Sequence, residues 1–225
     1  MRKKITPLLT LLFLLPAVQS AQAQQKFTVG IQGGLGGAFT ENRYTGGNAY
    51  TTDMLLGIPK VYPVWSHMYN LYLSYGISND FRIAFEPGVI RKGYGSKKIQ
   101  EERTVIFERR ELDYLQLPLL LEFSPDESLR FTAGPELGYL LKGKMRETHG
   151  SGPSALTDLP ENKRYSLGIQ IGGSYTLIKH LDVGLKIGAS FIGGDKYYLT
   201  NDNGEVLTKV ARENCYINSF VRVKL

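Results

Sequence analysis

The sequence predicts an all-β chain: an eight-stranded antiparallel transmembrane up-and-down β-barrel with long external loops and short periplasmic turns. Three observations predict it. Apolar residues recur at every second position in eight segments. Short and long connections alternate between these segments, and aromatic residues bracket an aliphatic band on the apolar face. The 25 Gly, 14 Tyr and 10 Phe of the 225 residues agree, because aromatic residues favour strands and Gly favours turns and close strand contacts.

The first residues have the pattern of an export signal. Arg2, Lys3 and Lys4 precede an apolar run at 8–18, and small residues suitable for cleavage follow at 21–23. The apolar run is too short for a membrane-spanning helix, which needs about 20 residues. We therefore expect residues 1–23 to be a cleavable signal peptide and residues 24–225 to form the barrel domain.

Removal of the signal peptide lowers the net charge of the chain, and export makes a nucleic-acid partner unexpected. The whole chain carries a net charge of +6, and removal of the three basic residues at positions 2–4 lowers it to +3. No basic helix and no interleaving of basic with aromatic residues indicates a nucleic-acid partner. The lone Cys215 has no second cysteine for an intramolecular disulfide.

Each segment supports its own strand. In the first segment, apolar residues such as Ile31 and Leu35 alternate with Gly and Gln. In the next two, apolar residues alternate with polar ones such as Arg82 and Glu86. The fourth is more apolar but keeps Leu at every second position, and the remaining four alternate again. A tilted strand crosses a bilayer in about 9–11 residues, and bacterial single-chain barrels have an even number of strands. The eight segments are 27–39, 70–77, 81–89, 111–123, 131–141, 165–177, 181–191 and 217–225.

The connections sort by length. Short turns are expected at 78–80, 124–128 and 178–180, and long connections at 40–68, 92–110, 142–164 and 192–215. Outer-membrane barrels have short periplasmic turns and longer external loops. The sorting therefore places both chain ends on the periplasmic side.

The aromatic residues of the apolar face gather at its two ends. Phe27, Phe81 and Phe123 are near the short turns, and Tyr69 and Tyr139 are near the long connections. Aromatic rings prefer the headgroup depth of a membrane, so this pattern is typical of a lipid-facing surface. The alternative is a soluble secreted ligand-binding β-barrel whose apolar face is its core, which explains neither the girdles nor the sorted connections.

Two neighbouring segments resemble a known family. Residues 114–123 (YLQLPLLLEF) and 131–144 (FTAGPELGYLLKGK), joined by a short turn, are similar to the PorT-like outer-membrane β-barrel protein family. The general layout of that family covers 27–225. The resemblance implies an exported protein integral to the outer membrane of a Gram-negative cell envelope. The founding type is associated with protein secretion, but no loop motif here indicates secretion, and the chain ends in Leu225 rather than in an aromatic residue.

The even-numbered positions are expected to face the interior and to form a structural charge network. Eight strands leave an interior that side chains fill, and buried charges there must pair. A functional alternative for Glu86, Glu136 and Lys186 is a proton or ion path, which requires a water-filled interior. The predicted network consists of Arg82, Glu86, Glu122, Arg130, Glu136, Lys186 and Arg222.

The sequence does not indicate an enzyme. Membrane-embedded lipid hydrolases need a nucleophile and a base within hydrogen-bond reach. The three histidines, His67, His149 and His180, fall in or beside connections, and no Ser partner is evident. The Gly-rich run at 33–37 lacks the spacing of a nucleotide motif, and no metal-ligand cluster has usable spacing. We therefore expect no catalytic residues, no cofactor and no metal.

By elimination, function is assigned to the long connections, because loops on a rigid scaffold carry binding. The leading hypothesis is a non-enzymatic surface-binding or assembly- and secretion-associated barrel, in contact with outer-membrane lipid and with a protein or glycan partner. The alternative is a narrow transport or ion-conducting barrel. The charged connection 92–110 is also compatible with a solvated hairpin that merely extends its strands. Candidate contacts are Tyr44, Tyr50, Tyr62, Trp65, Arg103, Arg109 and Arg110.

Overall fold

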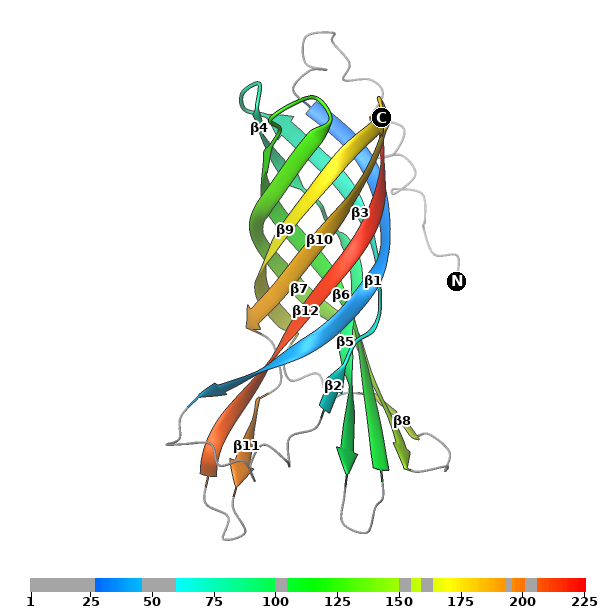
Figure 1. Cartoon of the computed structure of the whole chain (residues 1–225), viewed down its shortest axis with the longest axis vertical. Coiled ribbons are helices and arrows are strands. Elements are labelled where there is room, and N and C mark those ends of the chain that lie inside the picture. Colours follow the sequence, from blue (N-terminus) through cyan, green and yellow to red (C-terminus); the bar gives the residue numbers. More distant parts are fainter. Residues whose placement is uncertain are drawn as a thin grey trace, which may run out of the picture.

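The computed structural model describes residues 27–45, 60–99, 105–149, 155–158, 164–192, 196–200 and 206–225 (Figure 1). The regular structure within these ranges consists of strands alone. No helix in the described part of the chain has the length and apolarity that crossing a membrane requires. The predicted signal peptide, Tyr50 and Arg103 lie outside the described residues.

Eight antiparallel strands form a closed ring, which confirms the predicted all-β up-and-down architecture. β1 pairs with the last strand, β12, from Gly30 opposite Lys224 to Thr45 opposite Lys209, and this pairing closes the ring. Three short strands pair outside it: β2 (Lys60–Tyr62), β8 (Ala155–Asp158) and β11 (Lys196–Thr200). In ring order, the members are β1 (Phe27–Thr45), β3 (Val64–Gly76), β4 (Phe81–Phe85) with β5 (Gly88–Ile99), β6 (Val105–Phe123), β7 (Leu129–His149), β9 (Tyr165–Ile178), β10 (Leu181–Ile192) and β12 (Val206–Lys224).

β4 and β5 are one ring strand interrupted at Pro87, which has no N–H to donate. The pairing partners on β3 and β6 keep the same register on both sides of the interruption. The Pro87 carbonyl still accepts the Leu71 N–H at 2.9 Å, and the Glu86 N–H donates to the Pro118 carbonyl at 3.1 Å. β6 and β7 also keep one register across Pro118, so this proline marks no bulge.

The short turns lie at one end of the ring together with the C-terminus (Figure 1). In the β6–β7 turn, the Asp126 carboxylate accepts the N–H groups of Ser128 and Leu129, each at 2.7 Å. The Leu225 N–H donates to the Val29 carbonyl at 2.8 Å and ties the chain end to β1. The three short connections therefore lie on one side of the ring, as the length sorting predicts.

The strands at the opposite end run much further than the sequence predicts. Most of the predicted long connection 92–110 is paired strand, because β5 and β6 stay in register up to Ile99 opposite Val105. The structure therefore agrees with the alternative interpretation of 92–110, a charged hairpin that extends its two strands. The same correction applies at the ends of β1, β7 and β12. Apolar alternation reports only the lipid-facing part of a strand, whereas backbone pairing continues into water, where the side chains are charged.

The outward face is apolar over its middle. Ile31, Leu35 and Leu185 are exposed there, and the exposed aromatic residues lie above and below them. The Phe81 and Phe123 rings pack at 5.1 Å near the turns, and the Tyr139 and Tyr165 rings pack at 5.3 Å toward the other end. An exposed apolar surface of this extent is unfavourable in water and is what lipid contact requires.

Glycines on β10 make room for large aromatic side chains inside the ring. Gly188 faces Tyr216 and Gly184 faces Phe220 across the β10–β12 pair. A Cβ at Gly188 would lie 2.3 Å from the Tyr216 ring, and one at Gly184 would lie 2.7 Å from the Phe220 ring. The interior is therefore filled to the point where an added methyl group displaces a neighbour.

We expect Gly188→Val to destabilise the folded protein by about 1–3 kcal/mol, because the new side chain overpacks the interior against Tyr216. Gly173→Val is the matched control, since a Cβ there would meet its nearest neighbours at 3.8 Å, an ordinary contact. Urea unfolding of detergent-refolded protein, followed by tryptophan fluorescence, measures both. Equal unfolding midpoints for the two variants would contradict the filled interior.

Candidate functional site

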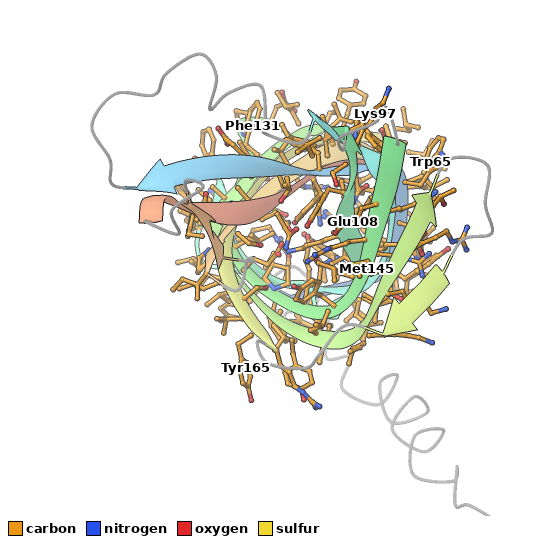
Figure 2. The ribbon with its side chains drawn as sticks, turned by 90° about the horizontal axis from the view of Figure 1, so that it is seen from below. Trp65, Lys97, Glu108, Phe131, Met145 and Tyr165 are labelled. Atoms are coloured by element: carbon orange, nitrogen blue, oxygen red, sulfur yellow. The ribbon has the colours of Figure 1, made fainter. Side chains whose placement is uncertain are left out.

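The seven residues of the predicted charge network all point into the ring. Figure 2, viewed along the ring axis, shows side chains filling the interior. Six of the seven come from five of the ring strands, and Glu86 comes from the interruption between β4 and β5. Alternation along each strand turns their even-numbered positions inward. They form a cluster at mid-height and take part in one nearer the turns and one nearer the long strand ends.

The central cluster is built around Glu86. Its carboxylate accepts hydrogen bonds from Arg222 Nη2 and Gln32 Nε2, each at 2.9 Å, and forms an ion pair with Lys186. Glu86 is 0% exposed, and Arg222 and Lys186 are each 1% exposed. The Arg222 guanidinium also lies over the Tyr72 ring, 3.7 Å from its centroid. One carboxylate thus holds two buried cations from β10 and β12.

The cluster nearer the turns contains two carboxylates. Asp182 lies 2.8 Å from Arg130 Nη1 and 2.7 Å from Lys224 Nζ. Glu122 accepts the Tyr72 hydroxyl at 2.8 Å and lies 3.6 Å from Arg82 and 3.8 Å from Arg130. Arg130 therefore links β6 to β10 across the interior. Asp182 and Lys224, which the alternation of the sequence also places at inward positions, belong to this cluster.

The cluster nearer the long strand ends contains a residue that the sequence interpretation missed. Lys92 donates to Glu136 at 2.5 Å and to Ser190 at 3.3 Å and is buried. The Tyr216 hydroxyl donates to Glu136 at 2.5 Å. Lys92 was assigned to a loop, which was wrong, because it continues the even-numbered inward row of Glu86, Gly88 and Ile90 on β5. Continuing the alternation of inward and outward positions beyond the apolar segment identifies Lys92 as an inward residue.

Apolar side chains fill the space beside these clusters. Val64, Met68, Ile90, Tyr114 and Phe220 are buried together in the half of the ring away from the turns. Charges surrounded in this way are costly unless they are paired, and pairing across strands joins the parts of the ring. The arrangement therefore links side chains of several ring strands across the interior.

The histidines make contacts of other kinds. His67 packs on Tyr69 with ring centroids 5.9 Å apart, and His180 Nδ1 lies 3.2 Å from the Lys224 carbonyl oxygen. The side chain of His149 is outside the described residues. Among the described residues, no group of three or more His, Cys, Asp or Glu side chains is arranged to hold a metal ion.

The candidate contact residues that are described do not form one surface. Trp65 is 73% exposed on the outward face of β3, and Tyr62 of β2 covers Gly95 on β5. Arg109 lies 3.0 Å from Glu111, whereas Arg110 pairs with Glu108 and lies over the Tyr94 ring at 5.7 Å. Adjacent positions on a strand point to opposite faces, so Arg109 and Arg110 are separated. Tyr44 lies in β1, and its side chain is outside the described residues.

A charged row begins outside the aromatic girdle. Arg91 Nε and Nη2 donate to the two Asp113 carboxylate oxygens at 2.7 and 3.1 Å, and Arg91 Nη1 lies 3.3 Å from Glu111. Outward ion pairs at this height indicate where the apolar part of the membrane ends.

We expect Glu86→Ala to destabilise the folded protein by about 3–5 kcal/mol, because Lys186 and Arg222 would remain buried without their carboxylate. Glu127→Ala in the exposed β6–β7 turn is the control, with an expected change within about 0.5 kcal/mol. Urea unfolding measures both. Equal losses would mean that the interior clusters contribute nothing specific to stability.

Comparisons with known proteins find one family model and several similar solved structures. A family model described as outer membrane protein beta-barrel domain matches residues 20–192. No curated protein matches the chain. Neisserial surface protein A is similar at 15% identity and a TM-score of 0.40, over 88% of this chain and 97% of that one. The outer membrane protease OmpT from Escherichia coli is similar at 9% identity and a TM-score of 0.44, over 89% and 97%. OprG from Pseudomonas aeruginosa is similar at 13% identity and a TM-score of 0.41, over 89% and 96%.

Proposed function

Because the chain belongs to the outer-membrane β-barrel domain family, we propose that it is a non-enzymatic surface protein that binds a partner through its extended strands. The barrel is integral to the outer membrane. The proposal includes export through cleavage of residues 1–23, with 24–225 as the mature barrel. It retains the PorT-like resemblance of 114–123 and 131–144 without transferring the role in secretion.

The filled interior is the observation that carries the proposal. Glu86, Lys186 and Arg222 are buried at mid-height, where both cations pair with the Glu86 carboxylate, while Tyr72 and Phe220 pack against them. A conducting barrel needs a continuous water path past this level, and eight strands leave room only for side chains. Transport through the barrel is therefore disfavoured, and the predicted charge network has a structural role.

The contacts of His67 and His180, the two histidines whose side chains are described, support a non-enzymatic role. Nucleophilic catalysis requires a base aligned with a nucleophile and an orienting group. His67 is packed on an aromatic ring of the outward face, and His180 is bonded to backbone in a turn. Neither arrangement resembles an activated base.

The extended strands offer the surface for a partner. The β5–β6 hairpin and the β7–β8 pair project beyond the ring on the side opposite the turns (Figure 1). Paired strands in water are a rigid support for side chains such as Lys97 and for the connections that join them. Tyr62, Trp65 and Arg109 at their bases fit contact with a protein or a glycan.

Site-specific photo-cross-linking in intact cells tests this proposal. A photoreactive amino acid at Lys97, which is exposed on β5, should link the protein to a partner of defined mass. The same group at Ser78, exposed in the short β3–β4 turn, is the matched control and should not give that product. Identical products from both positions, or none from position 97, would contradict partner binding through the extended strands.

A further inference from the structure

A bulge in β7 turns three basic residues onto the outward face. Tyr114 pairs with Leu140, but the next residue of β6, Asp113, pairs with Lys142, so β7 contains one extra residue at this point. Before the bulge, odd-numbered residues such as Leu137 point outward; beyond it, even-numbered ones do. Figure 2 shows Met145 on the inner side of the ring, as this change of parity requires. Bulges re-aim side chains in this way.

The result is a cationic belt on the outward face of β5, β6 and β7. Three acidic residues lie within it: Asp113 and Glu111 pair with Arg91 and Arg109, and Asp158 of β8 is the cross-strand neighbour of Lys144. Lys142, Lys144 and Arg146 follow one another along β7, and no described carboxylate forms an ion pair with any of them. The belt therefore carries an excess of positive charge. It consists of Arg91, Arg109, Lys142, Lys144 and Arg146.

The belt lies at the depth of the lipid headgroups. Arg91 follows Val89 and Asp113 precedes Leu115 by two residues, which is about 7 Å along a strand. Val89 and Leu115 are cross-strand neighbours of Tyr69 and Tyr139 in the aromatic girdle. Aromatic residues mark the boundary of the apolar layer, so the charges just beyond it meet the headgroups. The three described short turns lie at the opposite end of the ring, which is the periplasmic side in barrels of this kind, so we assign the belt to the outer leaflet.

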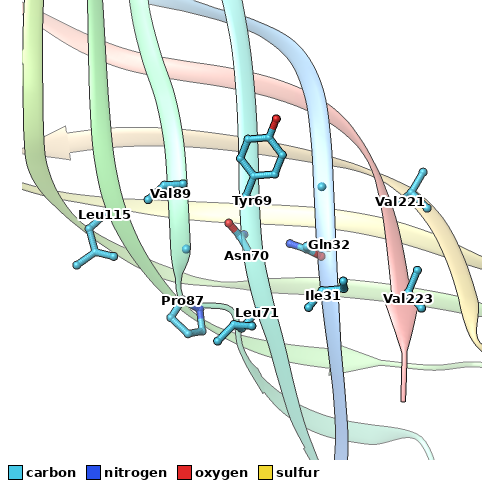
Figure 3. Close-up of a pocket in the computed structure, with 12 residues that line it drawn as sticks. Ile31, Gln32, Tyr69, Asn70, Leu71, Pro87, Val89, Leu115, Val221 and Val223 are labelled. Carbon is cyan, nitrogen blue, oxygen red and sulfur yellow. The ribbon is translucent and has the colours of Figure 1, made fainter. Parts of the chain in front are cut away.

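An apolar groove of about 600 Å³, whose lining residues are shown in Figure 3, begins at Val89 and Leu115, two residues along the strands from Arg91 and Asp113. It reaches from Leu115 and Val89 past Tyr69 and Leu71 to Val221 on β12. Gly33 leaves its floor open, since a Cβ there would meet only the Tyr69 ring, at 3.8 Å. A second groove of similar volume surrounds Gly173 near the turns, far along the strands from the belt.

We propose that the belt and the first groove together bind a phosphate-bearing glycolipid of the outer leaflet, with its phosphates on Lys142, Lys144 and Arg146 and one acyl chain in the groove. Phosphate oxygens accept charge-assisted hydrogen bonds from Lys and Arg. Four residues of strand separate the first and last of these cations, about 14 Å. A disaccharide headgroup with two phosphates spans that row, whereas the single phosphate of a phospholipid reaches only part of it.

Retention of bisphosphorylated lipid A by the protein purified from membranes in detergent tests the belt. The triple variant K142Q/K144Q/R146Q should retain lipid A at least about tenfold more weakly, because each basic residue near an anionic headgroup contributes to binding. Single variants R146Q and K179Q form a matched pair, since Lys179 is an exposed cation in the β9–β10 turn. Only R146Q should weaken retention. Faster gel migration before boiling verifies that each variant is folded.

The identity of the lipid is tested with the same protein. Dephosphorylated lipid A and phosphatidylglycerol should both bind more weakly than bisphosphorylated lipid A. Equal binding of the dephosphorylated lipid would overturn the role of the phosphates. Equal binding of phosphatidylglycerol would overturn the assignment to a glycolipid, and equal retention by R146Q and K179Q would overturn the belt.

The groove is tested by filling it. Gly33→Leu should weaken lipid A retention several-fold, while Gly173→Leu in the second groove should leave it unchanged. A Cβ at either position meets neighbours at 3.8 Å, so both variants can fold. Equal retention by the two variants would remove the groove from the proposed site.

Discussion

Lipid offers no hydrogen bonds to the N–H and C=O groups of a strand edge, so a sheet that spans a membrane must close on itself. Here the closure is the pairing of β1 with β12, which joins the two ends of the chain over the full height of the ring. Closure by eight strands fixes the interior diameter, and that diameter admits side chains but little else. The alternation of inward and outward residues follows from the same pairing, so charge on one face and apolar surface on the other are consequences of closure.

The interior shows how this narrow space is used. Glu86, Asp182 and Glu136 each bind cations from other strands, so the charges connect elements that are far apart in sequence. Gly188 and Gly184 have no side chains, and the space beside them is filled by Tyr216 and Phe220. A buried ion pair contributes little net stability compared with apolar packing, but loss of one partner is costly. Such an interior ties the strands together in one arrangement, and this is why we propose that binding lies on the outside of the ring and on the extended strands.

Much of the fold follows from the sequence. A strand in lipid needs an apolar residue at every second position, and barrels of this kind have short turns on one side of the membrane and longer connections on the other. The eight ring strands and their short turns are found in this way, and the inward row is readable from parity alone. The sequence does not show how far the strands extend beyond the membrane, because charged residues in paired strands resemble loop residues. For this reason the sequence interpretation places Lys92 in a loop. The bulge before Lys142 cannot be predicted from the sequence either, because it is visible only in the register between β6 and β7. The belt therefore appears only once the register is known.

We propose that the interior is closed to water and ions and that function lies outside it. Single-channel recording of the purified protein in planar lipid bilayers tests this most directly. The account predicts a current indistinguishable from that of the protein-free bilayer, because the bonded cluster of Glu86, Lys186 and Arg222 blocks the path at mid-height. Discrete and reproducible conductance steps, altered in size by Glu86→Gln, would contradict it and would show that ions pass through the ring.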